Sequence, residues 1–115
     1  MQLPISPGKI AHIIIRARKY DADMPDGGQG RELRAFIAAL NEEEQAALTA
    51  VMWIGRETFE HEEFGEAFAT ARAEATAPTE DYLMGIPMLS DYLEDGLIAL
   101  GISLEEAEED VDRPV

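Results

Sequence analysis

The stretch from Asn41 to Arg56 reads NEEEQAALTAVMWIGR and predicts one capped helix. Asn41 and Glu44 have the spacing of a capping box, in which the Asn side chain accepts from the third helical N–H and the Glu side chain reaches back. An apolar stripe then follows at helical spacing and consists of Ala47, Leu48 and Val51, with Met52 and Ile54 alongside. This helix is expected to end near Gly55 or Arg56.

The segments on both sides of this stretch repeat the helical spacing. Ser6 before Pro7 predicts the start of a helix that runs to about Tyr20, because proline suits the first helical position. Further helices are predicted at about 31–40, at 58–75 with Thr58 as the cap, at 87–100, and as short turns at 78–84 and after Ser103. The expected inner residues of the 87–100 helix are Met88, Leu89, Tyr92, Leu93 and Leu100.

No segment alternates apolar and polar residues as a half-buried strand does. The expected fold class is therefore all-α, with a single small domain built as an irregular bundle of about five to six helices. A length of 115 residues and a mass of 12.7 kDa fit one domain. We expect an acidic helical domain over 1–102, followed by an acidic turn and a frayed tail over 103–115.

The charge of the chain is strongly negative and unevenly distributed. Nine basic and 24 acidic residues give a net charge of −15, and the net charge is +2 over 1–40, −12 over 41–102 and −5 over 103–115. This distribution disfavours binding to nucleic acid or to an anionic membrane surface and favours basic partners, although acidity also serves simple solubility.

Several cellular settings and chemistries are disfavoured by the sequence. The chain has no cysteine, which excludes disulfides, thiolate zinc sites and cysteine nucleophiles. It has no apolar run of membrane-spanning length and no secretory pattern at its start, so a cytoplasmic location is the expectation.

Four separated blocks resemble an uncharacterised bacterial family. They are Leu33 to Gln45, Met52 to Arg56, Tyr82 to Pro87 and Asp91 to Leu97. In this order they resemble the family catalogued as domain of unknown function 3775, over about Leu33 to Gly101. The resemblance implies a small bacterial cytoplasmic protein and brings no activity, cofactor or catalytic residue with it.

One loop carries part of a calcium-binding pattern. Asp21, Asp23 and Glu32 occupy the first, third and twelfth positions of an EF-hand loop. The fifth position is Pro25 and the sixth, which needs glycine, is Asp26. An ordinary turn-rich loop is the favoured interpretation.

A second metal candidate lies around His61. The sequence from His61 to Gly65 begins like the zinc-protease helix but has glycine where the second histidine belongs. Glu57 precedes His61 by four residues, the spacing of one helical turn, within reach of a shared ligand. The favoured interpretation is a histidine on the helix surface. No catalytic or cofactor-binding residue is predicted.

Trp53 has two competing interpretations. It projects away from Val51 and Gly55 above small residues, as either a second core layer or a protein-binding hot spot would. Ile15 lies off the main apolar stripe of its helix, which suggests a partner or a second copy, as in a homodimer. Ile15, Trp53 and Arg56 are therefore the candidate interaction surface.

Other side chains are expected to act within the fold. The basic ridge of Lys9, His12, Arg16 and Lys19 is expected to pair with the acidic body of the chain or of a dimer mate. Gly55 and Gly96 fall on predicted inner faces, where a missing side chain permits close helix crossing, and Gly55 equally suits a helix end. Gly101 fits a left-handed helix cap.

The functional expectation is a non-enzymatic acidic helical module for protein interaction or regulation. Its partner is another protein or a second copy of the chain. The alternative is a divalent-cation-binding sensor or a small metal-dependent enzyme that uses the Asp21–Glu32 loop or the Glu57/His61 neighbourhood. A weaker idea is a nucleic-acid mimic that occupies a basic DNA-binding surface.

Overall fold

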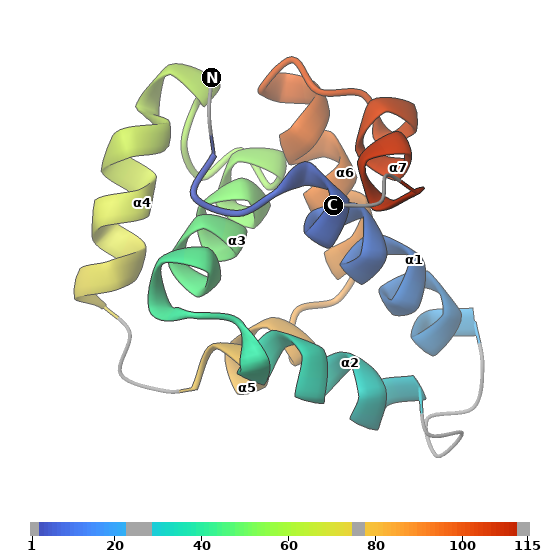
Figure 1. Cartoon of the computed structure of the whole chain (residues 1–115). Coiled ribbons are helices and arrows are strands. Elements are labelled where there is room, and N and C mark those ends of the chain that lie inside the picture. Colours follow the sequence, from blue (N-terminus) through green and yellow to red (C-terminus); the bar gives the residue numbers. More distant parts are fainter. Residues whose placement is uncertain (1–2, 23–28, 75–77, 113–115) are drawn as a thin grey trace.

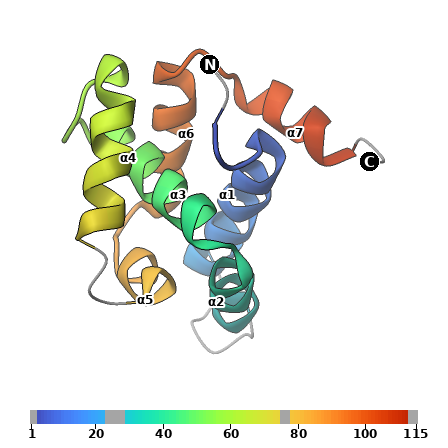
Figure 2. The same cartoon turned by 60° about the vertical axis from the view of Figure 1, so that its left-hand side comes forward.

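The computed structural model describes residues 3–22, 29–74 and 78–112. Within them the chain forms seven α-helices and one 3-10 turn, and no strand, which confirms the all-α fold class. The elements are α1 (Pro7–Ala22), α2 (Gln29–Ala39), α3 (Glu42–Gly55), η1 (His61–Glu63), α4 (Phe64–Ala73), α5 (Thr79–Met84), α6 (Leu89–Ala99) and α7 (Leu104–Asp112). Figures 1 and 2 show their arrangement.

Helix α3 lies at the centre of the bundle, with α6, α4 and α5 packed around it (Figure 1). The predicted capping box is present, since Glu44 N donates to Asn41 Oδ1 at 2.8 Å and Asn41 N donates to Glu44 Oε1 at 3.0 Å. Beyond the predicted stripe, Ala46, Thr49 and Ala50 are also buried. Burial on all sides explains why this helix carries so few polar residues after its first turn.

The α3–α6 crossing is the closest packing that the glycines reveal. A Cβ atom on Gly55 would lie 1.7 Å from the Tyr92 carbonyl oxygen, and one on Gly96 would lie 2.1 Å from the Val51 carbonyl oxygen. Each glycine therefore meets the backbone of the opposite helix. The expected close crossing is confirmed, and Gly55 is also the last residue of α3.

Helix α1 packs against α6, α2 and α7. Its predicted inner stripe is buried, with Ile10, Ile13 and Ile14 at 0% exposure and Ala17 at 3%. Ser6 Oγ accepts from Lys9 N at 3.2 Å, as an N-cap does. The helix continues to Ala22, slightly beyond the predicted end.

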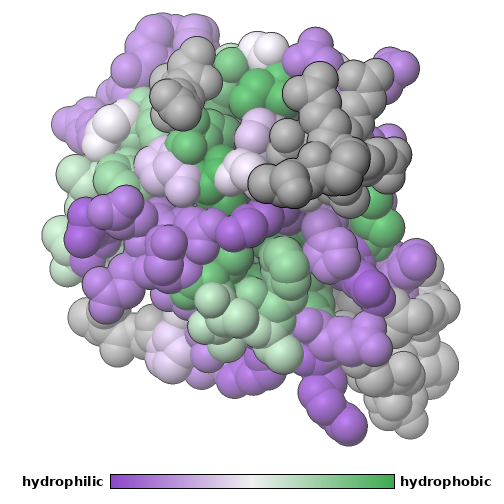
Figure 3. All heavy atoms as spheres, viewed as in Figure 1, coloured by the Kyte–Doolittle hydropathy of each residue, from purple (hydrophilic) through white to green (hydrophobic). Residues whose placement is uncertain are grey.

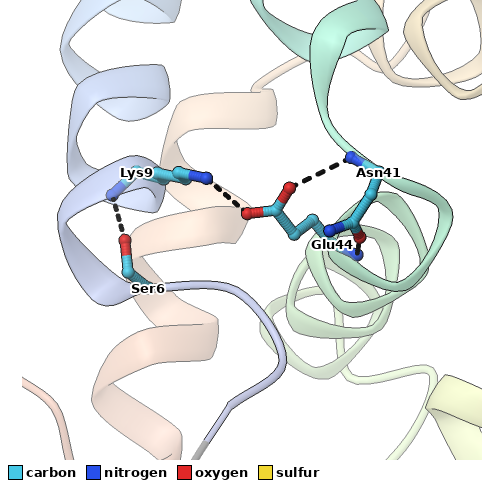
Figure 4. A network of polar contacts seen from close by, with 4 residues as sticks. All are labelled: Ser6, Lys9, Asn41 and Glu44. Carbon is cyan, nitrogen blue, oxygen red and sulfur yellow. Dashed lines mark hydrogen bonds and ion pairs between the residues drawn. The ribbon is translucent and has the colours of Figure 1, made fainter.

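The basic ridge of α1 binds acidic residues of the same chain. Lys9 Nζ donates to Glu44 Oε2 at 2.5 Å and Arg16 donates to Glu32 at 2.8 Å. Figure 4 shows how one Glu44 side chain joins Lys9 to the backbone of Asn41. Both contacts lower the pKa of Glu44, with the Lys9 hydrogen bond as the larger cause. Lys9 and Arg16 therefore anchor α1 to the start of α3 and to α2, and the expected pairing within the chain is confirmed for these two residues.

Three local predictions are wrong. The helix predicted from Thr58 begins instead with η1 at His61, because Glu63 Oε1 accepts from Glu60 N at 2.8 Å and Glu60 is the N-cap of this turn. Met88 is 56% exposed rather than inside, because it holds a left-handed backbone conformation at φ 61° before α6 begins. The last acidic segment is a nine-residue helix and not a single turn.

Helix α7 packs along α1 through Ala107, which is completely buried. Between α6 and α7, Gly101 at φ 85° provides the predicted left-handed cap. Gly101 N donates to Ile98 O and Ile102 N donates to Leu97 O, both at 2.9 Å. This turn directs the acidic C-terminal segment back onto the bundle. No helix of the described residues has the length and apolarity that a membrane crossing requires.

Candidate interaction surface

An open pocket lies where α3 ends, beside the C-terminal half of α6. Its volume is about 670 Å³. The apolar lining consists of Ile54, Gly55, Phe59 and Ala99, and the ionisable lining consists of Glu57, Glu60, His61, Glu62 and Asp95. It combines an apolar floor with an acidic rim, so it suits a group that is both cationic and partly apolar.

The rim carboxylates have little compensation within the chain. Among the described residues, Glu57, Glu60 and Asp95 form no ion pair, and the one ion pair of Glu62 is with His61 Nε2, at 2.6 Å. The last turns of α3 and α6 both contribute to the lining, and helix C-termini carry partial negative charge. The pocket therefore concentrates negative potential that an external cation would neutralise.

The turn after α3 holds Glu57 at the rim in a costly conformation. Its φ is 67°, Glu57 N donates to Ile54 O at 3.0 Å and Thr58 N donates to Trp53 O at 2.9 Å. These two bonds define the Schellman motif, whose left-handed position usually holds glycine. At the matching position after α6 the chain does have glycine, Gly101. Glu57 therefore carries strain that Gly101 avoids.

Replacing Glu57 by glycine is expected to stabilise the protein. Relief of the left-handed strain contributes roughly 1–2 kcal/mol, and the larger backbone entropy of glycine in the unfolded chain offsets about 0.5–1 kcal/mol of it. We expect Glu57→Gly to raise the free energy of unfolding by about 0.5–1 kcal/mol in urea titrations. Glu74→Gly, at a helix end with φ −99°, is the control and should bring no gain. A less stable Glu57→Gly protein would contradict this account.

The residues of the two candidate metal sites are placed differently in the structure. Asp23 lies outside the described residues, Asp21 belongs to the last turn of α1, and Glu32 is paired with Arg16. Glu57 and His61 do line one pocket, but not as neighbours on one helix, because α3 ends before Glu57 and η1 begins at His61. In the described part of the chain no group of three or more histidine, aspartate or glutamate residues is placed to hold a metal ion.

Trp53 packs against the core and is half-buried. Its Nε1 donates to the Tyr82 hydroxyl at 3.0 Å, and its ring lies 5.7 Å from that of Phe59. Since Phe59 lines the pocket, Trp53 supports the pocket floor from behind. The neighbouring Arg56 donates to Thr58 Oγ1 at 3.3 Å and does not line the pocket.

Ile15 lies apart from Trp53, so the three residues of the expected surface do not form one patch. Val51 and Gly55 face α6, and Trp53 projects from the other side of α3 towards α5. Ile15 lies on α1 and is 38% exposed. Another exposed side chain, Ile98, lies on α6 beside the pocket residues Asp95 and Ala99 and is 57% exposed.

A second, shallower hollow lies between α1 and α2, with a volume of about 460 Å³. Its lining consists of His12, Arg16, Glu32, Ala35 and Phe36. Figure 3 shows hydrophobic surface over α2 framed by hydrophilic residues on this face. Burial, and to a lesser extent Arg16, lower the pKa of His12, whose ring is tilted against the Phe36 ring at a centroid distance of 4.5 Å. The charges of this hollow are already paired, so it is the weaker candidate.

Four residues of this surface carry no sequence signal that joins them: Phe59, Glu60, Asp95 and Ile98. A single helix over 58–75 gives Glu60 no signal of its own and no neighbouring element. The available signal was the three-residue spacing from Glu60 to Glu63, which marks a helix start at His61. Asp95 joins the pocket only through the α3–α6 crossing, which local spacing does not specify.

Among known proteins, the chain is similar to one uncharacterised family. No curated protein and no solved structure matches the chain. The family model described as "Protein of unknown function (DUF3775)" matches residues 30–102, which extend from the first turn of α2 to just beyond α6 and include the whole pocket. This match spans well over half of the sequence, and the chain therefore belongs to the DUF3775 family.

Proposed function

We propose that this protein is a non-enzymatic interaction module that binds a basic segment of a partner protein at the pocket between α3 and α6. The observation that carries the proposal is the uncompensated acidic rim of Glu57, Glu60 and Asp95 over an apolar floor. A Lys or Arg side chain matches this pocket, because its methylene stem covers apolar surface while its charge meets the carboxylates.

The overall charge supports the same partner chemistry. At a net charge of −15, the molecule attracts basic partners over a distance and repels phosphate backbones and anionic membrane surfaces. A cytoplasmic setting is part of the proposal and is compatible with a chain that has no cysteine.

Peptide selection on the immobilised protein tests this function. From a phage-displayed library of random peptides, we expect enrichment of sequences in which Arg or Lys lies next to apolar residues. Fluorescence anisotropy with a selected, labelled peptide then compares the wild type with Glu60→Gln/Asp95→Asn, which removes two rim charges. We expect about tenfold weaker binding, or ~1.4 kcal/mol.

The control removes the same amount of charge elsewhere. Glu105→Gln/Glu106→Gln lies on the exposed side of α7, away from the pocket lining. Binding to this control should change less than about twofold, because screening weakens distant charges at physiological salt. An equal loss in both variants would mean attraction to net charge alone and would refute a specific pocket. Selected peptides without Arg or Lys would refute the basic partner.

A further inference from the structure

We infer that the partner segment is a basic amphipathic helix whose contact continues from the pocket across α6 to α1, where Ile98 and Ile15 receive its apolar side chains. This inference rests on the proposed function and specifies the shape and the apolar requirement of the partner. Ile98 and Ile15 are two of the four large hydrophobic side chains that the described residues expose, at 57% and 38%.

The position of Ile98 on α6 connects the pocket to α1. At about 3.6 residues per turn, Ile98 lies between Asp95, which lines the pocket, and Glu94, which points to α1. The exposed side of α6 therefore runs from the pocket wall through Ile98 to the α1 contact. A partner seated in the pocket has Ile98 as its neighbouring apolar contact.

An ion pair between α1 and α6 places Ile15 one helical turn from the α1–α6 contact. Arg18 donates to Glu94 at 2.5 Å, and Asp91 lies 3.7 Å from the same guanidinium. Figure 2 shows that α1 and α6 run in opposite directions. Ile15 precedes Arg18 by one turn, and Ile98 follows Glu94 by one turn, so both isoleucines lie on the same side of this pair.

The side chains along the exposed side of α6 favour one kind of partner. Asp95 is an exposed carboxylate one helical turn before Ile98, so the surface offers an apolar contact bordered by negative charge. A basic amphipathic helix presents apolar residues three or four positions apart with Lys or Arg alongside, which matches this layout. A second copy of the chain matches less well, since two bodies of charge −15 repel each other.

The experiment compares two exposed side chains of nearly equal exposure near the two ends of α6. Ile98→Ser removes the proposed contact, and Met88→Ser, at 56% exposure before the other end of the helix, is the control. With the selected peptide from the pocket test, we expect the Kd to rise about tenfold for Ile98→Ser and to change less than about twofold for Met88→Ser. Urea titrations verify that both variants fold. A third variant, Ile15→Ser, should weaken peptide binding about threefold.

Each alternative outcome is distinguishable. If Glu60→Gln/Asp95→Asn weakens binding and Ile98→Ser does not, this inference is overturned while the pocket function stands. If neither variant weakens binding, both are overturned. If the protein sediments as a dimer that Ile98→Ser dissociates, with no effect on peptide affinity, then a second copy covers the exposed side of α6 and the basic helix is ruled out. Circular dichroism should also show the peptide gaining helix on binding.

Discussion

Replacing Gly96 by alanine is expected to lower the free energy of unfolding by about 3 kcal/mol. The added Cβ would lie 2.1 Å from the Val51 carbonyl oxygen and 2.8 Å from Val51 Cγ1. The carbonyl belongs to the backbone of α3 and cannot rotate away, so the two central helices must separate. Their separation also loosens the buried contacts of Leu93 and Leu97 on the same side of α6.

Gly65→Ala is the matched control, because Gly65 lies in α4 with nothing within 4 Å of its added Cβ. There the higher helix propensity of alanine should stabilise the protein by about 0.5–1 kcal/mol. Chemical denaturation measures both variants. A Gly96→Ala protein as stable as the wild type would show that α3 and α6 pack less closely than the structure has them.

Gly55→Ala should also lower the free energy of unfolding. The loss in the double variant with Gly96→Ala should be smaller than the sum of the two single losses, because both changes act on one crossing.

The second large effect is expected for Trp53→Ala, a loss of about 3 kcal/mol of stability. The indole packs against the core and supports Phe59, and its N–H donates to Tyr82. Tyr82→Phe removes the hydroxyl acceptor alone and should cost about 1 kcal/mol or less, because Tyr82 is 39% exposed and water can accept the indole N–H. Urea titrations of the two variants separate packing from hydrogen bonding.

Trp53 also offers a test of its role beside the pocket. Trp53→Phe keeps an aromatic ring behind Phe59, and it should retain peptide affinity within about threefold while it loses part of the stability. A Trp53→Ala protein that keeps wild-type stability but no longer binds peptide would instead place Trp53 in the partner surface. The stability measurement therefore decides between the two interpretations that the sequence left open.

Much of the local structure was predictable because helix signals act over one or two turns. Ser6 and Pro7, the Asn41–Glu44 capping box and Gly101 each specify a helix end through hydrogen bonds to nearby backbone groups. The failures were local as well. Thr58 resembled a cap, but the Schellman turn at Glu57 and the reach of Glu63 to the Glu60 backbone moved the start to His61.

The candidate surface was predicted only in fragments. Ile15, Trp53, Glu57 and His61 were each identified, but not as parts of one surface. Glu57 and His61 line the pocket, Trp53 packs against Phe59, and Ile15 lies on α1 one turn before Arg18. Asp95, Glu60 and Ile98 were not connected to them, because they come from elements far apart in the sequence. Spacing along one helix gives no information about which helix lies beside it.

The all-α fold class, the net charge of −15 and the apolar faces of most helices can be predicted from residue types and their spacing. These properties follow from residue type and from a period of about 3.6, which need no knowledge of neighbours. The crossing of α3 and α6 at Gly55 and Gly96, which brings Asp95 to the pocket of Glu57 and Glu60, is visible only in the folded protein. The physical reason is that helix packing depends on contacts between distant segments, and an apolar stripe is compatible with several partners.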